Sequence, residues 1–157
     1  MKHSPVRILA ITASFITLAL TTAATPSRSV SSIAKKPTIT VYKDPSCGCC
    51  KNWIQHLIKH GYQVDAKDTP NMAEIKRTLG VPDAVTSCHT ALVNGYLIEG
   101  HVPAADIDRL LEKKPRIAGL GVPGMPMGSP GMEGPVSQHY KVLSFDKSGK
   151  TSVFAAH

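Results

Sequence analysis

Three cysteines within four residues set the strongest constraint on how this chain folds. Cys47, Cys49 and Cys50 follow a β-branched, alternating segment, residues 38–42, which predicts a strand. An amphipathic stripe that starts at Trp53 comes next and predicts a helix. The cysteines therefore stand where a strand ends and a helix begins. Backbone N–H groups and the positive end of the helix dipole meet at such a point and lower thiol pKa values, so thiolates are available there near neutral pH.

The residues after the cysteine turn continue to alternate between strand and helix patterns. The expected elements are a first helix ending at Gly61, a strand over 62–66, a helix over 71–79, strands over 90–93 and 96–99, and a helix over 103–114. The Asn94-Gly95 dipeptide between the paired strands predicts a hairpin with a type I′ turn. The order β-α-β-α-β-β-α predicts an α/β domain of thioredoxin-like topology.

A segment rich in glycine, proline and methionine, residues 115–135, interrupts this pattern. It contains 5 Pro and 6 Gly, so we expect an ordered or flexible loop without a helix or central strand. Met125, Met127 and Met132 in this loop offer thioether sulfurs, which are soft ligands suited to Cu(I). They could equally be adaptable apolar filler against the domain surface. A C-terminal hairpin is expected over 140–154.

The N-terminal residues have the features of an export signal. Lys2 and Arg7 precede an apolar run over 8–20, and small residues lead up to an expected cleavage site after Ala24. An uncleaved membrane anchor is the alternative, which the short apolar run disfavours. We therefore expect a signal peptide over 1–24, a flexible tether over 25–36, and one periplasmic domain over 37–157.

The charge of the chain belongs mostly to the signal and the tether. The whole chain carries a formal charge of +7, but from residue 37 onward 13 basic residues face 11 acidic ones. Nucleic-acid binding needs a clustered basic face, and aromatic residues, at 5%, are too few for a single-strand stacking platform. We expect no nucleic-acid partner, no membrane association after signal cleavage, and a monomer.

The fourth cysteine is expected to lie close to the other three. Cys88 and His89 stand in the loop before the strand at residue 90, and in a thioredoxin-like topology this loop packs against the cysteine turn. Thioredoxins usually place a cis-proline there, but this sequence has no proline between Pro82 and Pro103. A thiol and an imidazole in its place favour metal capture over disulfide exchange.

Further histidines are weaker candidates. His101, after the hairpin, could complete a sulfur-rich site with His89, although a lone histidine is more often a polar surface or capping residue. His56 and His60 are spaced i, i+4 but fall away from the apolar stripe of their helix. We therefore expect them on a solvated face.

The cysteines leave several chemistries open. A soft-metal site fits the thiolates best. Two disulfides are the alternative in an oxidising compartment, and only a pairing of Cys47 with Cys50, or one through Cys88, is free of evident strain. A redox-active Cys-x-x-Cys pair, Cys47 and Cys50, also fits. An iron–sulfur cluster is weakened by the Cys-x-Cys-Cys spacing and by unfolded export.

The chain resembles the CopG-like periplasmic copper-resistance proteins, long catalogued as a domain of unknown function. The resemblance spans residues 39–133 and rests on four motifs in one order: Cys47-Gly48-Cys49-Cys50-Lys51-x-Trp53, Ser87-Cys88-His89-Thr90-Ala91, Gly95-Tyr96-x-Ile98-Glu99-Gly100-His101-Val102-Pro103, and Gly121-Val122-Pro123-Gly124-Met125-Pro126-x-Gly128-Ser129-Pro130-Gly131-Met132-Glu133. It implies a thioredoxin-like fold, copper binding through the clustered cysteines, and a role in copper handling outside the cytoplasm.

These observations predict a periplasmic copper-binding protein of copper resistance or homeostasis. It would hold copper, chiefly Cu(I), with thiolates that can bridge several ions, and could exchange copper with other periplasmic copper-handling proteins. The expected ligands are Cys47, Cys49, Cys50, Cys88, His101, His89, Met125 and Met127. The alternative function is a periplasmic thiol–disulfide or copper-dependent oxidoreductase that uses Cys47 and Cys50.

Overall fold

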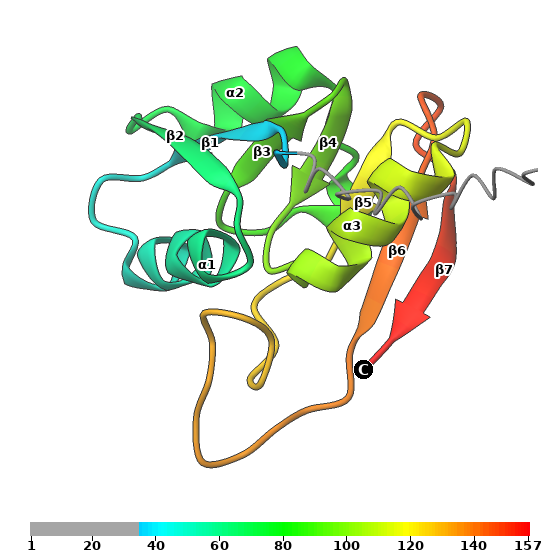
Figure 1. Ribbon diagram of the computed structural model, residues 1–157. Coiled ribbons are helices and arrows are strands. Elements are labelled where there is room, and N and C mark those ends of the chain that lie inside the picture. The colour runs from blue at the N-terminus through cyan, green and yellow to red at the C-terminus, as the bar shows by residue number, and fades with distance from the viewer. Residues whose placement is uncertain (1–34) are drawn as a thin grey trace, which may run out of the picture. The chain divides into compact units, whose positions relative to one another are not determined.

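A seven-stranded mixed sheet, in the order β2-β1-β3-β4-β5-β6-β7, organises residues 35–157, the part of the chain that this computed structural model describes (Figure 1). The predicted signal peptide and the predicted tether before residue 35 lie outside the described residues. The strands are β1 (Thr38–Lys43), β2 (Gln63–Asp68), β3 (Thr90–Val93), β4 (Tyr96–Glu99), β5 (Gly119–Gly121), β6 (Lys141–Phe145) and β7 (Thr151–Ala156). The helices are α1 (Gly48–Lys59), α2 (Met72–Leu79) and α3 (Ala104–Lys113), with a 3-10 turn over Asp83–Val85.

The order of elements up to α3 confirms the predicted β-α-β-α-β-β-α arrangement of a mixed α/β fold. β1 and β2 are parallel neighbours connected through α1, and β3 and β4 form an antiparallel hairpin. Asn94 and Gly95 in its turn both have positive φ, 47° and 84°. A type I′ turn requires positive φ at both positions, which is why this dipeptide predicts the hairpin.

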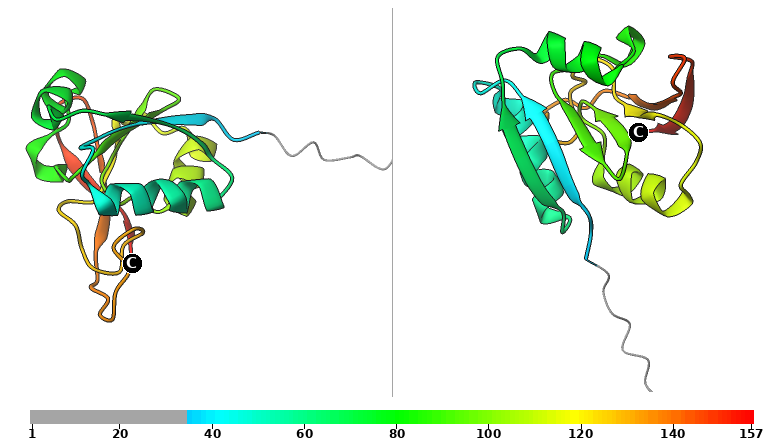
Figure 2. Two further views of the ribbon diagram at one scale, coloured as in Figure 1. Left: turned by 90° about the vertical axis from the view of Figure 1, so that its left-hand side faces the viewer. Right: turned by 90° about the horizontal axis from the view of Figure 1, so that it is seen from above.

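Helices cover both faces of the sheet: α1 and α3 pack on one face and α2 on the other (Figure 2). The larger core lies between the sheet, α1 and α3, and its biggest fully buried side chains include Trp53, Leu57, Ile98, Ile107 and Leu110. A smaller cluster joins Val81, Val85, Leu97 and Phe145. The consecutive residues Leu97 and Ile98 belong to different clusters because side chains alternate between the two faces of a strand.

The short strand β5 corrects the expectation that the Gly/Pro/Met loop, residues 115–135, holds no central strand. Gly119–Gly121 pairs with β4 in parallel and with β6 in antiparallel orientation, and all three residues are buried. A Cβ on Gly119 would lie 2.1 Å from the carbonyl oxygen of Leu97, and one on Gly121 would lie 2.7 Å from Cβ of Val85. These glycines therefore allow close packing within the sheet instead of breaking a strand.

The last two strands extend the sheet beyond β5 and confirm the predicted C-terminal hairpin. Side chains of α3 bind this hairpin. Asp106 accepts from the guanidinium of Arg109 at 3.0 Å, and its other oxygen lies 2.7 Å from Nε2 of His157. Arg109 also donates to the carbonyl oxygen of Phe154 at 2.9 Å. Within residues 35–157, no helix has both the length and the hydropathy that crossing a membrane requires.

Candidate metal centre

The cysteine turn, residues 47–50, is shaped by local contacts between the end of β1 and the first turn of α1. The Cys47 N–H donates to the carbonyl oxygen of Asp44 at 3.1 Å, which tightens the connection after the strand. Cys47 is the N-cap residue of α1, and its sulfur accepts the N–H of Cys50 at 3.3 Å. The structure thus places all three sulfurs of the turn at the positive end of the helix, as predicted.

Two of the four cysteines are joined in this structure. Cys47 and Cys50 form a disulfide with a Cα–Cα separation of 5.4 Å, one of the pairings that the sequence left open. Cys49 and Cys88 are free thiols, each half-buried. Ligation by four thiolates therefore belongs to the reduced form of the protein, since a disulfide sulfur is not a thiolate.

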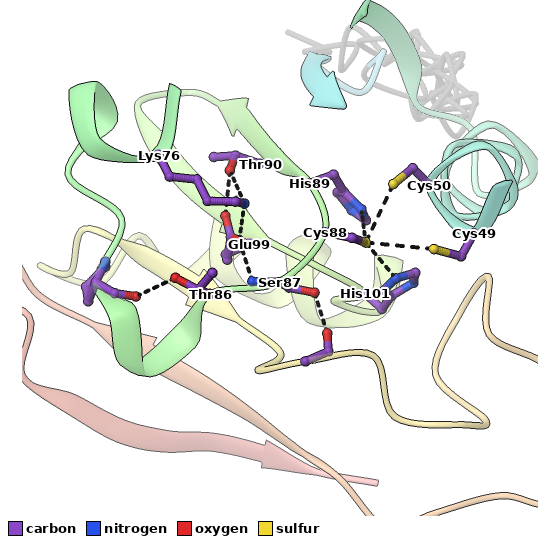
Figure 3. Close-up of polar contacts among 12 residues, drawn as sticks. Cys49, Cys50, Lys76, Thr86, Ser87, Cys88, His89, Thr90, Glu99 and His101 are labelled. Atoms are coloured by element: carbon purple, nitrogen blue, oxygen red, sulfur yellow. Dashed lines mark hydrogen bonds and ion pairs between the residues drawn. The ribbon is translucent and has the colours of Figure 1, made fainter. Parts of the chain in front are cut away.

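The sulfur of Cys88 occupies the middle of the site (Figure 3). It lies 3.5 Å from Sγ of Cys50 and 3.9 Å from Sγ of Cys49. On its other side it lies 3.2 Å from Nδ1 of His89 and 3.2 Å from Nε2 of His101. The loop before β3 does pack against the cysteine turn, so residues almost forty positions apart in sequence share one small volume.

The side chains form two potential ligand groups that share one atom. Within the described residues, the sulfurs of the four cysteines lie within 4.8 Å of one another, and so do the ligand atoms of Cys88, His89 and His101. Cys88 is the residue that these two groups share. A thiolate can bridge two soft metal ions, so this arrangement can hold more than one ion in the reduced protein.

His101 is fixed in the tautomer that a metal ligand needs. Its Nδ1 lies 2.8 Å from the carbonyl oxygen of Pro130, which can only accept, so Nδ1 carries the proton. Nε2 then presents its lone pair toward the sulfur of Cys88. Burial lowers the pKa of His101 below its ordinary value of 6.5, which favours this neutral form. A backbone carbonyl holding the outer nitrogen in this way is the usual support of a ligating histidine.

His89 is completely buried between the site and the core. Its ring packs against Trp53 with 4.3 Å between centroids and a tilt of 40° between the planes, and Trp53 in turn donates from Nε1 to the carbonyl oxygen of Val102 at 2.9 Å. Burial, and then the neighbouring His101, hold the pKa of His89 well below 6.5, so the ring is neutral at neutral pH. Its Nδ1 is the nitrogen beside the sulfur of Cys88, and its Nε2 is buried without a hydrogen-bond partner among the described residues.

Burial also changes the pKa of the Cys88 thiol. It raises the pKa of Cys88 to about 12, and the neighbouring Cys49 adds to the increase. The metal-free thiol is therefore protonated at neutral pH. A metal ion that binds this sulfur must displace its proton, so affinity should rise with pH.

The two methionines that were expected to act as ligands lie in different surroundings. Sδ of Met125 is 3.9 Å from Sγ of Cys49, and Met125 is 51% exposed, at the outer side of the cluster. The Met127 N–H instead donates to Oε1 of Gln138 at 3.0 Å, the Met127 carbonyl oxygen accepts the Gln138 N–H at 2.9 Å, and the Met127 side chain lies close to Gly134. No contact among the described residues joins Met127 to the cysteines, whereas Met125 is brought into the site.

The backbone of the Gly/Pro/Met loop lies against the first turn of α1. Gly131 has φ +85°, and a Cβ there would lie 2.7 Å from the backbone nitrogen of Trp53 and 2.8 Å from the carbonyl oxygen of Cys49. Only glycine fits this approach. The contact places Pro130 where its carbonyl reaches His101, so the loop forms one wall of the site.

His56 departs from the solvated face that was expected. Its Nε2 accepts the N–H of Ala104 at 3.0 Å, so this half-buried ring caps the first turn of α3. His60 is exposed, and its Nδ1 lies 2.8 Å from the carbonyl oxygen of His56. Burial lowers the pKa of His56, which keeps its Nε2 a neutral acceptor. His56 therefore makes a structural contact between α1 and α3, and neither histidine belongs to the two ligand groups of the metal centre.

Sequence patterns did not identify Glu99, a buried residue that supports the loop containing Cys88. Glu99 at the end of β4 is fully buried and contacts Lys76 of α2, Ser87 and Thr90. Burial raises the pKa of this carboxyl, while Lys76 acts in the opposite direction. The sequence signal was a charged residue directly after the apolar run of a strand.

Comparisons with known proteins give the family. The family model described as "Protein of unknown function, DUF411" matches residues 85–132, and no curated protein matches the chain. Two solved structures of copper resistance protein CopG, forms 2 and 1, have TM-scores of 0.74 and 0.73 to this chain. Each is 45% identical to it, over 78% of this chain and 98% of the other. The chain therefore belongs to the CopG-like copper-resistance family that its four motifs indicated.

Proposed function

We propose that this protein binds copper outside the cytoplasm, chiefly as Cu(I), in a thiolate-bridged site that serves copper resistance. The CopG relatives support the metal and the role, since they are described as copper resistance proteins. The donor set supports the oxidation state, because thiolate, thioether and imidazole together favour Cu(I) over harder ions.

The observation that carries this proposal is the position of Cys88. Its sulfur belongs to both ligand groups, four cysteines on one side and two histidines on the other. In the reduced protein a bridging Cys88 would let the two groups bind separate copper ions side by side. Met125 would add an exposed ligand next to Cys49, at the point where copper enters or leaves.

Copper loading would depend on the redox state of the cysteine turn. Reduction of the Cys47–Cys50 disulfide takes two electrons and two protons and yields two thiols, which lose their protons on binding metal. The oxidised form keeps only Cys49 and Cys88 as thiols. An exported protein would therefore need a reductant, or copper delivered before the disulfide forms.

The test is an anaerobic titration of the reduced protein with Cu(I), followed by native mass spectrometry. We expect more than one Cu(I) per chain. A variant with all four cysteines replaced by serine should bind none at the same free copper concentration, while His60→Gln, which changes an exposed histidine outside the site, should bind as the parent does. Equal binding by the four-serine variant, or no binding by the reduced parent, would contradict the proposal.

Export is tested separately. We propose that the N-terminal residues are removed after Ala24 and that the mature protein is periplasmic, because residues 1–24 have the order of a secretory signal. The intact mass of the protein from a periplasmic extract should correspond to a chain beginning at Thr25. A full-length chain retained with the cytoplasm would contradict it.

A second candidate function is thiol–disulfide or copper-dependent oxidoreductase activity. A specific observation favours it: a Cys-x-x-Cys disulfide at a helix N-terminus lies 3.5 Å from the thiol of Cys88. The metal-free protein would then show a measurable two-electron potential and disulfide reductase activity that Cys50→Ser abolishes. A change in the oxidation state of bound copper during turnover would indicate the copper-dependent form.

A further inference from the structure

A buried carboxylate beside the metal centre is surrounded by hydrogen-bond donors (Figure 3). One oxygen of Glu99 accepts the Ser87 N–H at 2.7 Å and also contacts Nζ of Lys76. The other oxygen lies 2.6 Å from the hydroxyl of Thr90. The Glu99 side chain is fully buried, and that of Lys76 is 12% exposed. The network therefore joins β4, α2 and the loop before β3 with almost no access to water.

The direction of every bond in this network is determined by chemistry. A backbone N–H and an ammonium group can only donate. Thr90 accepts from Nζ of Lys76 at 2.9 Å, which leaves its own hydroxyl proton for Glu99. Each donor around the carboxylate therefore meets an acceptor oxygen. A complete network of this kind stabilises a single arrangement, whereas a partly satisfied one is destabilising.

The two loop bonds enclose the ligand pair. Ser87 directly precedes Cys88, and Thr90 directly follows His89, so one carboxylate holds the chain on both sides of these two residues. The same loop is tied to the wall of the site, because the Ser87 hydroxyl donates to the carbonyl oxygen of Gly124 and the Gly124 N–H donates to Thr86. Neither Glu99 nor Lys76 is among the sulfur and imidazole groups that contact the Cys88 sulfur.

We infer that Glu99, paired with Lys76, is a positioning residue that holds the Cys88–His89 segment at its distance from the cysteine turn. Its two acceptor oxygens fix the backbone, and the backbone fixes where the sulfur and the imidazole point. Lys76 balances the charge of the carboxylate, so that it can be buried. The expected change in copper affinity on losing this pair rests on the proposed function, whereas the expected loosening of the loop does not.

The loop is tested in the metal-free, reduced protein by amide hydrogen exchange. Replacing both partners by apolar side chains of similar size, K76M/E99L, leaves no unpaired buried charge. We expect the Ser87 amide to exchange at least about tenfold faster, while the paired amides of β1 and β3 keep the parent rate. E99Q retains one acceptor oxygen and should exchange at a rate between those of the parent and K76M/E99L, and E74Q, at an exposed position of α2, should change nothing. Parent protection of Ser87 in K76M/E99L would overturn the inference.

Copper binding is tested by a double-mutant cycle. We expect K76M/E99L to lower Cu(I) affinity by about tenfold, in the range seen when the support of a metal ligand is removed. In a C88S/H89Q background the same pair of substitutions should change affinity by less than about twofold, because both residues being positioned are gone. An equal loss in both backgrounds would assign the pair a general structural role and overturn the inference.

Two controls keep the result interpretable. If K76M/E99L does not fold, E99Q carries the test alone, with an expected loss of about threefold in Cu(I) affinity that disappears in the C88S/H89Q background. E99Q with parent affinity would then overturn the inference. If the parent itself binds no Cu(I), the proposed function fails, and the Ser87 exchange rates decide the positioning role independently.

Discussion

The cysteine turn at the start of α1 and the Cys88 side of the site, formed by Cys88, His89 and His101, are held by different kinds of contact. The turn depends on bonds between residues a few positions apart, and Cys49 in it is half-buried beside the exposed Met125. On the Cys88 side the two histidines are fully buried, and this side depends on residues far away in sequence: Pro130, Trp53 and Glu99.

From this difference we infer that the cysteine turn is the adaptable side of the site and that the Cys88 side fixes where the ligands lie. The cysteine turn contains the Cys47–Cys50 disulfide, so the number of thiols that it offers depends on reduction. The Cys88 side has little freedom, because its ligands are anchored to β3, β4 and the Gly/Pro/Met loop. We expect the turn to control when copper binds and the Cys88 side to control how tightly it binds.

Removing the shared sulfur should have the largest effect. Cys88→Ser takes one ligand from each group, so Cu(I) affinity should fall by roughly a hundredfold, which is about 2.7 kcal/mol. Cys49→Ser is the matched control, since it removes a sulfur from one group only and should lose less. Competition titration with a colorimetric Cu(I) chelator measures both, and an equal loss in the two variants would show that the two sides do not differ.

Oxidation of the cysteine turn should have the second-largest effect on Cu(I) binding. The disulfide form has two of its four thiols blocked, so its Cu(I) capacity should fall by about half or more relative to the reduced protein. The C47S/C50S variant cannot form this disulfide, and its capacity should depend much less on prior reduction. Unchanged capacity in the oxidised parent would mean that the turn does not control loading.

The buried histidines should make the stability of the metal-free protein sensitive to acid. The pKa of His89 is lowered by burial, so below its ordinary value of 6.5 the unfolded chain binds more protons than the folded one. Stability is therefore fully present above pH 6.5 and decreases as the pH falls further. Urea unfolding across this range measures it, and His89→Gln should flatten the dependence. An identical slope in parent and variant would assign the acid sensitivity to other groups.

Met125 should produce the smallest change. Met125→Leu keeps the size of an exposed side chain and removes only its thioether, so we expect a loss of about two- to threefold in Cu(I) affinity or transfer rate. Met127→Leu, in the same loop but in contact with Gln138, should have no effect. A larger effect from Met127 would mean that the loop rearranges when copper binds.

Much of the fold and of the grouping of ligands could be predicted from the sequence. Periodicity and turn residues located the strands and helices around the site, and the order of these elements predicted that the loop with Cys88 and His89 faces the cysteine turn. The predicted grouping of cysteines with His101 rests on the same topology. These inferences need only local patterns and the order of elements.

The remaining features depend on contacts that no local pattern encodes. The glycines around Leu120 predicted a loop, but they form a buried strand. Glycine is required in this strand because Val85 and the backbone of β4 leave no room for a Cβ. Likewise, nothing adjacent to Glu99 indicates that it holds the chain on either side of Cys88 and His89, since its partners lie in α2 and in residues 87–90.

The sharing of Cys88 between the two ligand groups is tested most directly by a crystal structure of the reduced, anaerobically Cu(I)-loaded protein, with anomalous scattering recorded at the copper edge. We predict at least two copper peaks bonded to Sγ of Cys88, one toward the cysteine turn and one toward His89 and His101. A single copper bound by the turn alone, with Cys88 uncoordinated, would contradict the account.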